Sequence, residues 1–383
     1  MPGLFRLPRL SPLARVRLRR FRRHRRGWWS LWIFLFIFLA SLVAEVWSND
    51  KPIFVRYDGQ NYYPLFAAYP ETEFGGFLPT EADYKDPEIR ALIEERGFVV
   101  AAPNPWHYRT IDFDLASPAP TRPDSRHLLG TDDQARDILA RLIYGLRISV
   151  IFGFTVTLFS AMIGVSIGAF QGFRGGKVDL FGQRFIEIWS GVPQLYILII
   201  LASIFEPNFW WLLVILLLFS WIGFTSLVRA EVLRARNFDY VRAARALGLP
   251  QRVVLVRHVM PNAMVATLTL LPFTLAGSVT ILTALDFLGI GLPPGSASLG
   301  ELLLQGRNNL QAPWIVLTGF FALAFLLTIL IFLGEAVRDV FDPRKIFAGQ
   351  AAAEDAFADI GDDGDENGAV NTMDDSDGAA VIV

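Results

Sequence analysis

The 383-residue chain contains no cysteine, which excludes a disulfide, a thiolate metal site and a cysteine nucleophile. Its four histidines stand at positions 24, 107, 127 and 258, without the spacing of metal ligands. The sequence shows neither a Ser-His-Asp order nor a pair of carboxylates that would suggest a catalytic centre. We therefore predict that the chain is not an enzyme and that it holds no cofactor or metal.

A nucleotide-binding loop is also missing. Gly175-Gly176-Lys177 superficially resembles a phosphate loop, but it lacks the preceding glycine and the following Ser or Thr of a Walker A motif. The chain cannot bind ATP in that manner. Any ATP-driven work would require a partner ATPase.

Charge is scarce and apolar residues are abundant, at 19% and 53% of the chain. Six uncharged runs are near or above the length of about 18–20 residues that crosses about 30 Å of hydrocarbon. They are Trp28–Ala44, Ile148–Phe173, Ile188–Phe205, Pro207–Val228, Val259–Leu285 and Leu310–Gly334. This pattern predicts an all-α polytopic membrane protein with six transmembrane helices.

The two ends of the chain differ steeply in charge. Residues 1–26 carry ten Arg and no acid, and residues 351–383 carry ten acids and no Lys or Arg. A basic arm can bind nucleic acid, but directly before an apolar run it favours a cytoplasmic anchor beside anionic lipid. We therefore expect membrane lipid and no nucleic acid as a partner, and both termini in the cytoplasm.

These patterns divide the chain into five segments. We predict a basic cytoplasmic arm at 1–27, a first span at 28–47, a periplasmic insertion with an interfacial helix at 48–147, a five-helix core at 148–345 and a disordered acidic tail at 346–383. The insertion is read as a small α+β unit in which Asp86 caps a short helix ending at Gly97. Its last part places four apolar residues on one helical face. They are Ile138, Leu139, Leu142 and Ile143.

Small and helix-breaking residues interrupt the apolar runs. Gly164, Gly168 and Gly172 recur at a spacing of four, which predicts close approach of another helix, although glycine is common in membrane helices. Pro193 and Pro272 should kink their helices, either as part of a moving pathway or as static bends. Glu187 marks either a proton or substrate route or a structural ion pair with Arg184.

The most informative stretch lies at 239–261, between two apolar runs. It is basic, rich in alanine and amphipathic, and it predicts two short helices broken at Gly248-Leu249-Pro250. Asp239 is the expected N-cap and Pro261 the expected end of the second helix. Ala243 and Ala244 form a smooth ridge that a partner's groove could hold. An ordinary interfacial amphipathic helix is the alternative.

The residue order of this stretch resembles the EAA loop of binding-protein-dependent ABC importers. The matching positions are Arg242, Ala243, Ala244, Gly248, His258, Met260 and Pro261, with Arg242 in place of the leading Glu and His258 in place of Ile. Further segments resemble the C-type permease of dipeptide, oligopeptide and nickel importers. They are Leu129-Gly-Thr-Asp132, Gly175-Gly-Lys-Val-Asp179, Phe287-Leu-Gly-Ile-Gly291-Leu-Pro-Pro294 and Gly334-Glu-Ala-Val-Arg338-Asp339. Gly182-Gln-Arg-Phe-Ile-Glu187 and Gly300-Glu-Leu-Leu-Leu-Gln-Gly306 are similar to the Yej-type branch, associated with microcin C and peptide uptake.

The resemblance implies an ABC type I importer permease fold in the bacterial inner membrane. It further implies a heterodimer with a homologous permease, a cytoplasmic ABC ATPase docked on the 239–261 loop and a periplasmic substrate-binding protein. The function would be import of peptides or peptide-like compounds. A secondary transporter or channel for small solutes is the alternative, which would need buried ionisable residues along a pathway or an inverted repeat.

Overall fold

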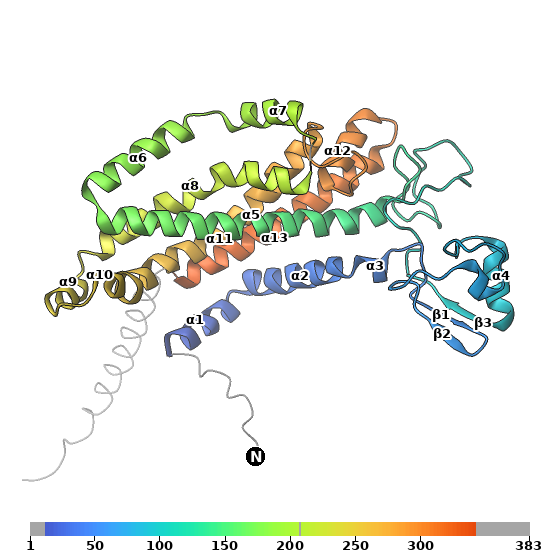
Figure 1. Cartoon of the computed structure of the whole chain (residues 1–383), viewed down its shortest axis with the longest axis horizontal. Helices are drawn as coiled ribbons and strands as arrows, with labels where there is room; N and C mark the ends of the chain where they lie inside the picture. The colour runs from blue at the N-terminus through green and yellow to red at the C-terminus, as the bar shows by residue number, and fades with distance from the viewer. Residues whose placement is uncertain (1–11, 207, 342–383) are drawn as a thin grey trace, which may run out of the picture.

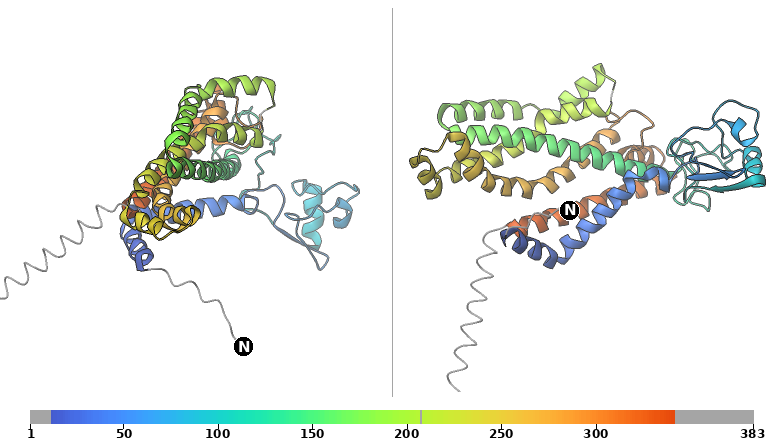
Figure 2. Two further views of the ribbon diagram at one scale, coloured as in Figure 1. Left: turned by 60° about the vertical axis from the view of Figure 1, so that its left-hand side comes forward. Right: turned by 60° about the horizontal axis from the view of Figure 1, so that its bottom comes forward.

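The computed structural model describes residues 12–206 and 208–341. These residues form a long helical bundle with a small lobe, residues 48–137, at one end and the 239–261 loop at the other (Figure 1). Figure 2 shows the same arrangement from two further directions. The predicted acidic tail lies outside the described residues.

The bundle and its connections contain helices of very different length. In chain order they are α1 (Pro12–Arg23), α2 (Arg25–Leu42), α3 (Ala44–Trp47), α5 (Ile138–Arg174), α6 (Gly176–Ser190), α7 (Gln194–Ile204), α8 (Phe209–Ala235), α9 (Asp239–Ala246), α10 (Gln251–Val253), the π-helix η2 (Val254–Val259), α11 (Met260–Phe287), α12 (Leu299–Asn308) and α13 (Pro313–Phe341).

Four helical segments within the described part of the chain are long and apolar enough to cross a membrane: α5, α8, Gln251–Phe287 and α13. The pair α6 and α7 makes a fifth if it is counted as one span, bent by 64°. The predicted first span corresponds to α2, which begins with Arg25 and Arg26 and is not among them. The structure thus confirms a helical polytopic membrane protein, and the count of six spans stays a prediction.

The glycines of α5 face α8. A Cβ atom at Gly168 would lie 2.6 Å from the carbonyl oxygen of Thr225, and one at Gly164 would lie 2.6 Å from that of Trp221. At Gly172 the corresponding contact is the carbonyl oxygen of Arg229, 2.8 Å away. Because these partners are backbone atoms, only glycine lets the two helices approach this closely. The predicted packing face is confirmed, and its partner is α8.

Helix α5 continues without interruption for 37 residues. The predicted boundary at 147/148 therefore falls inside it, and the interfacial helix and the second span are one element. Of the four residues on the predicted apolar face, only Ile138 is fully buried, because the helix turns Arg141 and Tyr144 inward as well. The predicted boundary at 27/28 likewise falls inside α2, where Gly27 packs against Ala336 of α13.

The lobe contains a three-stranded antiparallel sheet in the order β2-β1-β3, formed by β1 (Phe54–Tyr57), β2 (Gln60–Tyr62) and β3 (Gly97–Val100). The hairpin between β1 and β2 turns at Asp58-Gly59, which have φ angles of 47° and 79°. Both angles are positive, as a two-residue hairpin turn of the Asp-Gly type requires.

A helix and an aromatic cluster complete the lobe. The predicted short helix is α4 (Pro87–Arg96), and the Asp86 side chain accepts a hydrogen bond from the backbone N–H of Glu88 at 2.8 Å. A 3-10 helix, η1 (Glu71–Phe74), brings Phe74 to the centre, where it is fully buried. Tyr57, Tyr62 and Tyr84 meet this ring edge to face. The result is a separate small core at the end of the bundle.

Candidate functional site

The 239–261 loop has one separate short helix, α9, which is followed by a left-handed turn at Gly248 with a φ of 78°. The second predicted helix differs from expectation, because α10 and η2 continue directly into α11. Pro261 therefore lies at the second position of α11, directly after η2, instead of ending a helix. Asp239 is the first helical residue, and the N-cap position belongs to Phe238.

One face of the loop packs on the bundle and the other is free. Val241, Ala244, Val254 and Val259 are buried in a cluster with apolar residues of α5, α8 and α11. Those residues are Ala169, Val228, Val232, Ala235 and Ala263. The buried set anchors α9, because each side chain leaves water only when the loop is seated on the helix ends.

The exposed face is apolar at several points. Leu247 is 83% exposed and Val256 is 67% exposed. Ala243 is exposed, whereas Ala244 is buried in the chain's own core, so the predicted two-residue ridge is reduced to Ala243. Arg242 lies on the exposed side next to it.

A tyrosine ties the beginning of the loop to its end. The Tyr240 hydroxyl donates to the carbonyl oxygen of His258 at 3.4 Å and accepts from Asn262 Nδ2 at 2.6 Å. His258 is half-buried and Pro261 exposed. Among the described residues, no group of three or more His, Asp or Glu could hold a metal ion.

Arg229 of α8 and Arg236, the C-cap residue of α8, secure the root of the loop. Arg229 makes a bidentate ion pair with Asp179 of α6, with Nη2 to Oδ2 at 2.7 Å. Arg236 donates from Nη1 to the carbonyl oxygen of Gly172 at 3.1 Å. In the sequence, Asp179 at the end of the Gly175-Gly-Lys-Val motif was the residue that could have indicated the ion pair with Arg229.

The predicted pathway residues lie away from the loop motif. Pro193 is the N-cap residue of α7, at the break where α6 and α7 meet at 64°. Pro272 lies inside α11, which continues through it. Glu187 pairs with Arg184 at 2.5 Å, and both side chains are more than half exposed, which matches the structural reading of this carboxylate.

A buried cluster of polar side chains lies where the lobe meets α5. His127 is fully buried between two carboxylates, with Nδ1 2.9 Å from Asp137 and Nε2 3.1 Å from Asp112. Asp137 also caps α5 through the N–H of Ala140, at 2.7 Å, and accepts from Asn104 at 2.8 Å. Burial alone would lower the pKa of His127, but the two carboxylates outweigh it and raise the pKa above its usual value.

The beginning of α5 carries a further buried ion network. Asp132 Oδ2 lies 2.8 Å from Arg136 Nε and 3.3 Å from Arg141 Nη1. Arg141 is fully buried and donates to the carbonyl oxygen of Ser296 at 2.9 Å. Nearby, Asp286 accepts from the N–H of Leu292 at 2.7 Å. These contacts join the lobe, α5 and the segment before α12 into one polar junction.

The family comparisons agree with this architecture. The model described as the binding-protein-dependent transport system inner membrane component matches residues 164–347. The model described as the N-terminal TM domain of oligopeptide transport permease C matches residues 11–70.

Individual relatives match over most of the chain. The inner membrane ABC transporter permease protein YejE of Escherichia coli is 57% identical over 88% of this chain and 99% of its own length. The peptidoglycan transport system permease protein YejE of Agrobacterium fabrum is 52% identical over 89% and 95%. The oligopeptide transport system permease OppC of Haemophilus influenzae is 32% identical over 64% and 80%. A chain of the inward-facing MetNI methionine transporter is 17% identical, with a TM-score of 0.45 over 53% of this chain and 97% of its own.

The apolar helices of the bundle, together with the family match, define a membrane permease, a subunit that carries out no catalysis of its own. The chain belongs to the permease subunits of binding-protein-dependent ABC transporters, with the YejE and OppC permeases. Membership in this family implies an ATPase and a substrate-binding protein as partners.

Proposed function

We propose that this chain is one of two homologous membrane subunits of an importer for peptides or peptide-like compounds. The oligopeptide and peptidoglycan transport systems named for its relatives support a peptide-containing substrate. Compounds of the microcin C type belong to the same chemical class. ATP is hydrolysed by the partner ATPase, and this chain converts the resulting movement into opening of the pathway.

The proposed topology has six spans, with α2 as the first and the bent pair α6 and α7 as the third. The basic arm and the 239–261 loop are cytoplasmic, since residues 229–257 carry seven Arg against two acids. The lobe is then periplasmic, and its exposed aromatics receive the substrate-binding protein. Phe66, Phe77 and Phe113 are 82%, 96% and 89% exposed.

The free face of the 239–261 loop, with its exposed Leu247 and Val256, is the observation that carries the coupling role. The loop is anchored by its own buried valines and stiffened at its root by Arg229 and Arg236, so a push on its free face is passed to α8 and α11. Leu247 projects from this face at the end of α9. Pro193 and Pro272, at the break between α6 and α7 and inside α11, are the proposed points where the spans bend, with Glu187 beside the first.

A matched pair of substitutions tests the docking face. Leu247 and Leu310 are 83% and 82% exposed, but they lie at the opposite ends of the bundle. We expect Leu247→Glu to weaken association with the ATPase, because it places a charge in a dry groove, and Leu310→Glu to leave association unchanged. Co-purification of the ATPase with each variant measures this. Equal recovery of the ATPase with both variants would contradict docking through this face, and uptake without any ATPase would favour a secondary transporter or channel.

Orientation is tested by thiol labelling in this cysteine-free chain. Asp86→Cys in the lobe should react with a membrane-impermeant thiol reagent in spheroplasts, and Arg252→Cys in the loop should not. Labelling only at position 252 would mean that the topology is inverted.

A further inference from the structure

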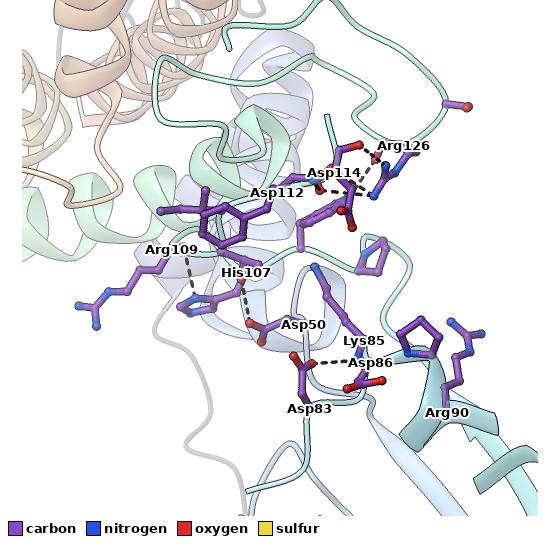
Figure 3. Close-up of a pocket in the computed structure, with 17 residues that line it drawn as sticks. Asp50, Asp83, Lys85, Asp86, Arg90, His107, Arg109, Asp112, Asp114 and Arg126 are labelled. Carbon is purple, nitrogen blue, oxygen red and sulfur yellow. Dashed lines mark hydrogen bonds and ion pairs between the residues drawn. The ribbon is translucent and has the colours of Figure 1, made fainter. Parts of the chain in front are cut away.

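The arginine-rich helix α1 takes no part in the coupling described above. It carries six Arg and no acid. Its exposed arginine face consists of Arg19, Arg22 and Arg23. None of these three makes an ion pair with a carboxylate in the part of the chain that the structure describes. The open pocket of the lobe differs, because Arg126 there lies 3.2 Å from Asp112 (Figure 3).

The opposite side of α1 rests on the end of α13, and the two helices lie side by side in Figure 1. The guanidinium of Arg17 is 4.7 Å from the centre of the ring of Phe341, the last described residue. His24 Nε2 lies 3.8 Å from Asp339 Oδ2. Since the twelve residues of α1 span about 18 Å, all its arginines lie near the point at which the chain continues beyond Phe341.

The segment that follows α13 has the opposite charge. Residues 351–383 carry ten Asp and Glu and no Lys or Arg. The first of these acids, Glu354, comes 13 positions after Phe341, and an extended chain of that length reaches about 43 Å, more than the length of α1. A tether this short gives the acids an effective concentration on the order of millimolar at the arginine face.

Anionic lipid headgroups also attract arginine side chains. A lipid surface on the arginine face would, however, hold the ten acids of the same chain close to further negative charge, where the two repel each other. The acidic segment on the arginine face removes this repulsion and neutralises both ends of the chain. The charges therefore favour a contact within the chain.

We propose that the acidic segment 351–383 docks on the arginine face of α1. Its carboxylates supply the ion-pair partners that Arg19, Arg22 and Arg23 lack among the described residues, and they link the helix before α2 to the end of α13. The contact is carried by charge, so salt screens it. It requires neither the proposed transport function nor the proposed side of the membrane.

The test uses the full chain in nanodiscs of phosphatidylcholine and a fluorescent peptide of residues 351–383 as the probe, with binding measured by anisotropy. In one form of the chain the ten acids of this segment are replaced by their amides. This form should bind the peptide, and the wild-type chain should bind it about tenfold more weakly or worse, because its own acidic segment covers α1. A peptide in which the ten acids are amides should not bind. About 1 M salt should abolish binding of the acidic peptide.

Two triple variants of the amide form then assign the binding face. Arg19→Gln, Arg22→Gln and Arg23→Gln together should weaken peptide binding about tenfold or more. The matched control removes three arginines that are also exposed, in the 239–261 loop, and it should leave binding unchanged. Its substitutions are Arg242→Gln, Arg252→Gln and Arg257→Gln.

Three results would overturn the proposal. The first is no binding of the acidic peptide, or equal binding by the wild-type chain and the amide form. The second is a loss of binding in the loop variant and not in the α1 variant, which would place the acidic segment on the loop. The third is release of the peptide when phosphatidylglycerol replaces phosphatidylcholine, which would mean that lipid headgroups occupy the arginine face.

Discussion

The close contact between α5 and α8 makes a quantitative prediction at Gly168. An alanine there would place its Cβ 2.6 Å from the carbonyl oxygen of Thr225 and 3.1 Å from the backbone nitrogen of Arg229. Neither backbone atom can move away by a side-chain rotation, so the helices must separate. Overpacking of this kind costs about 1–3 kcal/mol, against about 0.5–1 kcal/mol gained because alanine suits a helix better than glycine. We therefore expect a net loss of stability.

The matched control is Gly223→Ala on α8. Gly223 is also helical, but a Cβ there meets nothing within 4 Å. It should keep the helix-forming gain without the clash. Thermal melting of the purified variants in one detergent should rank Gly168→Ala below the wild type and Gly223→Ala at or above it. A Gly168→Ala protein that melts no lower than the wild type would refute the close packing.

Two further predictions concern the ends of the bundle. His127→Ala should destabilise the lobe by about 3–5 kcal/mol because it leaves Asp112 and Asp137 buried without their shared partner, and limited proteolysis of the lobe should detect this. In the wild type the pKa of His127 is raised in the folded state. The stabilisation that the charged ring gives the lobe is therefore complete below the unfolded-state pKa and is lost as pH rises through the folded-state pKa. Protease resistance of the lobe that stays constant over this pH range would contradict a charged ring. Gly248→Ala should cost about 1–2 kcal/mol in the seated loop through its positive φ alone, since a Cβ there meets nothing within 4 Å, and it should reduce ATPase-dependent uptake more than Gly223→Ala does.

Much of the bundle follows from simple patterns. Long uncharged runs predict α5, α8, α11 and α13, because burial in hydrocarbon requires such lengths whatever the tertiary contacts are. The break before α7 follows from Pro193, which lacks the N–H that a regular helix interior requires. The glycine repeat predicts a close helix contact, but spacing alone does not say which helix will meet it.

The parts that escaped prediction depend on how irregular chain segments meet. Asp112, His127 and Asp137 lie 10 and 15 positions apart in coil and turn, where no periodicity relates them. The burial of Ala244 was missed because Ala243 and Ala244 are identical in type, and only the helix ends beneath α9 decide which of the two faces inward. The continuity of α5 was missed because its first turns bury Arg141, and a charged residue reads as a surface position.

The uninterrupted length of α5 has a mechanical consequence. At 37 residues it is about 55 Å long, well beyond the roughly 30 Å of the hydrocarbon core. Its last turns meet Arg236 at the root of the 239–261 loop, and its first residue is capped by Asp137 at the lobe. In the proposed topology such a rod would work as a lever between the two sides of the membrane: a tilt of about 5° displaces the far end by about 5 Å. A movement of the ATPase would thus be transmitted to the lobe directly through α5, without any change in the fold of the lobe.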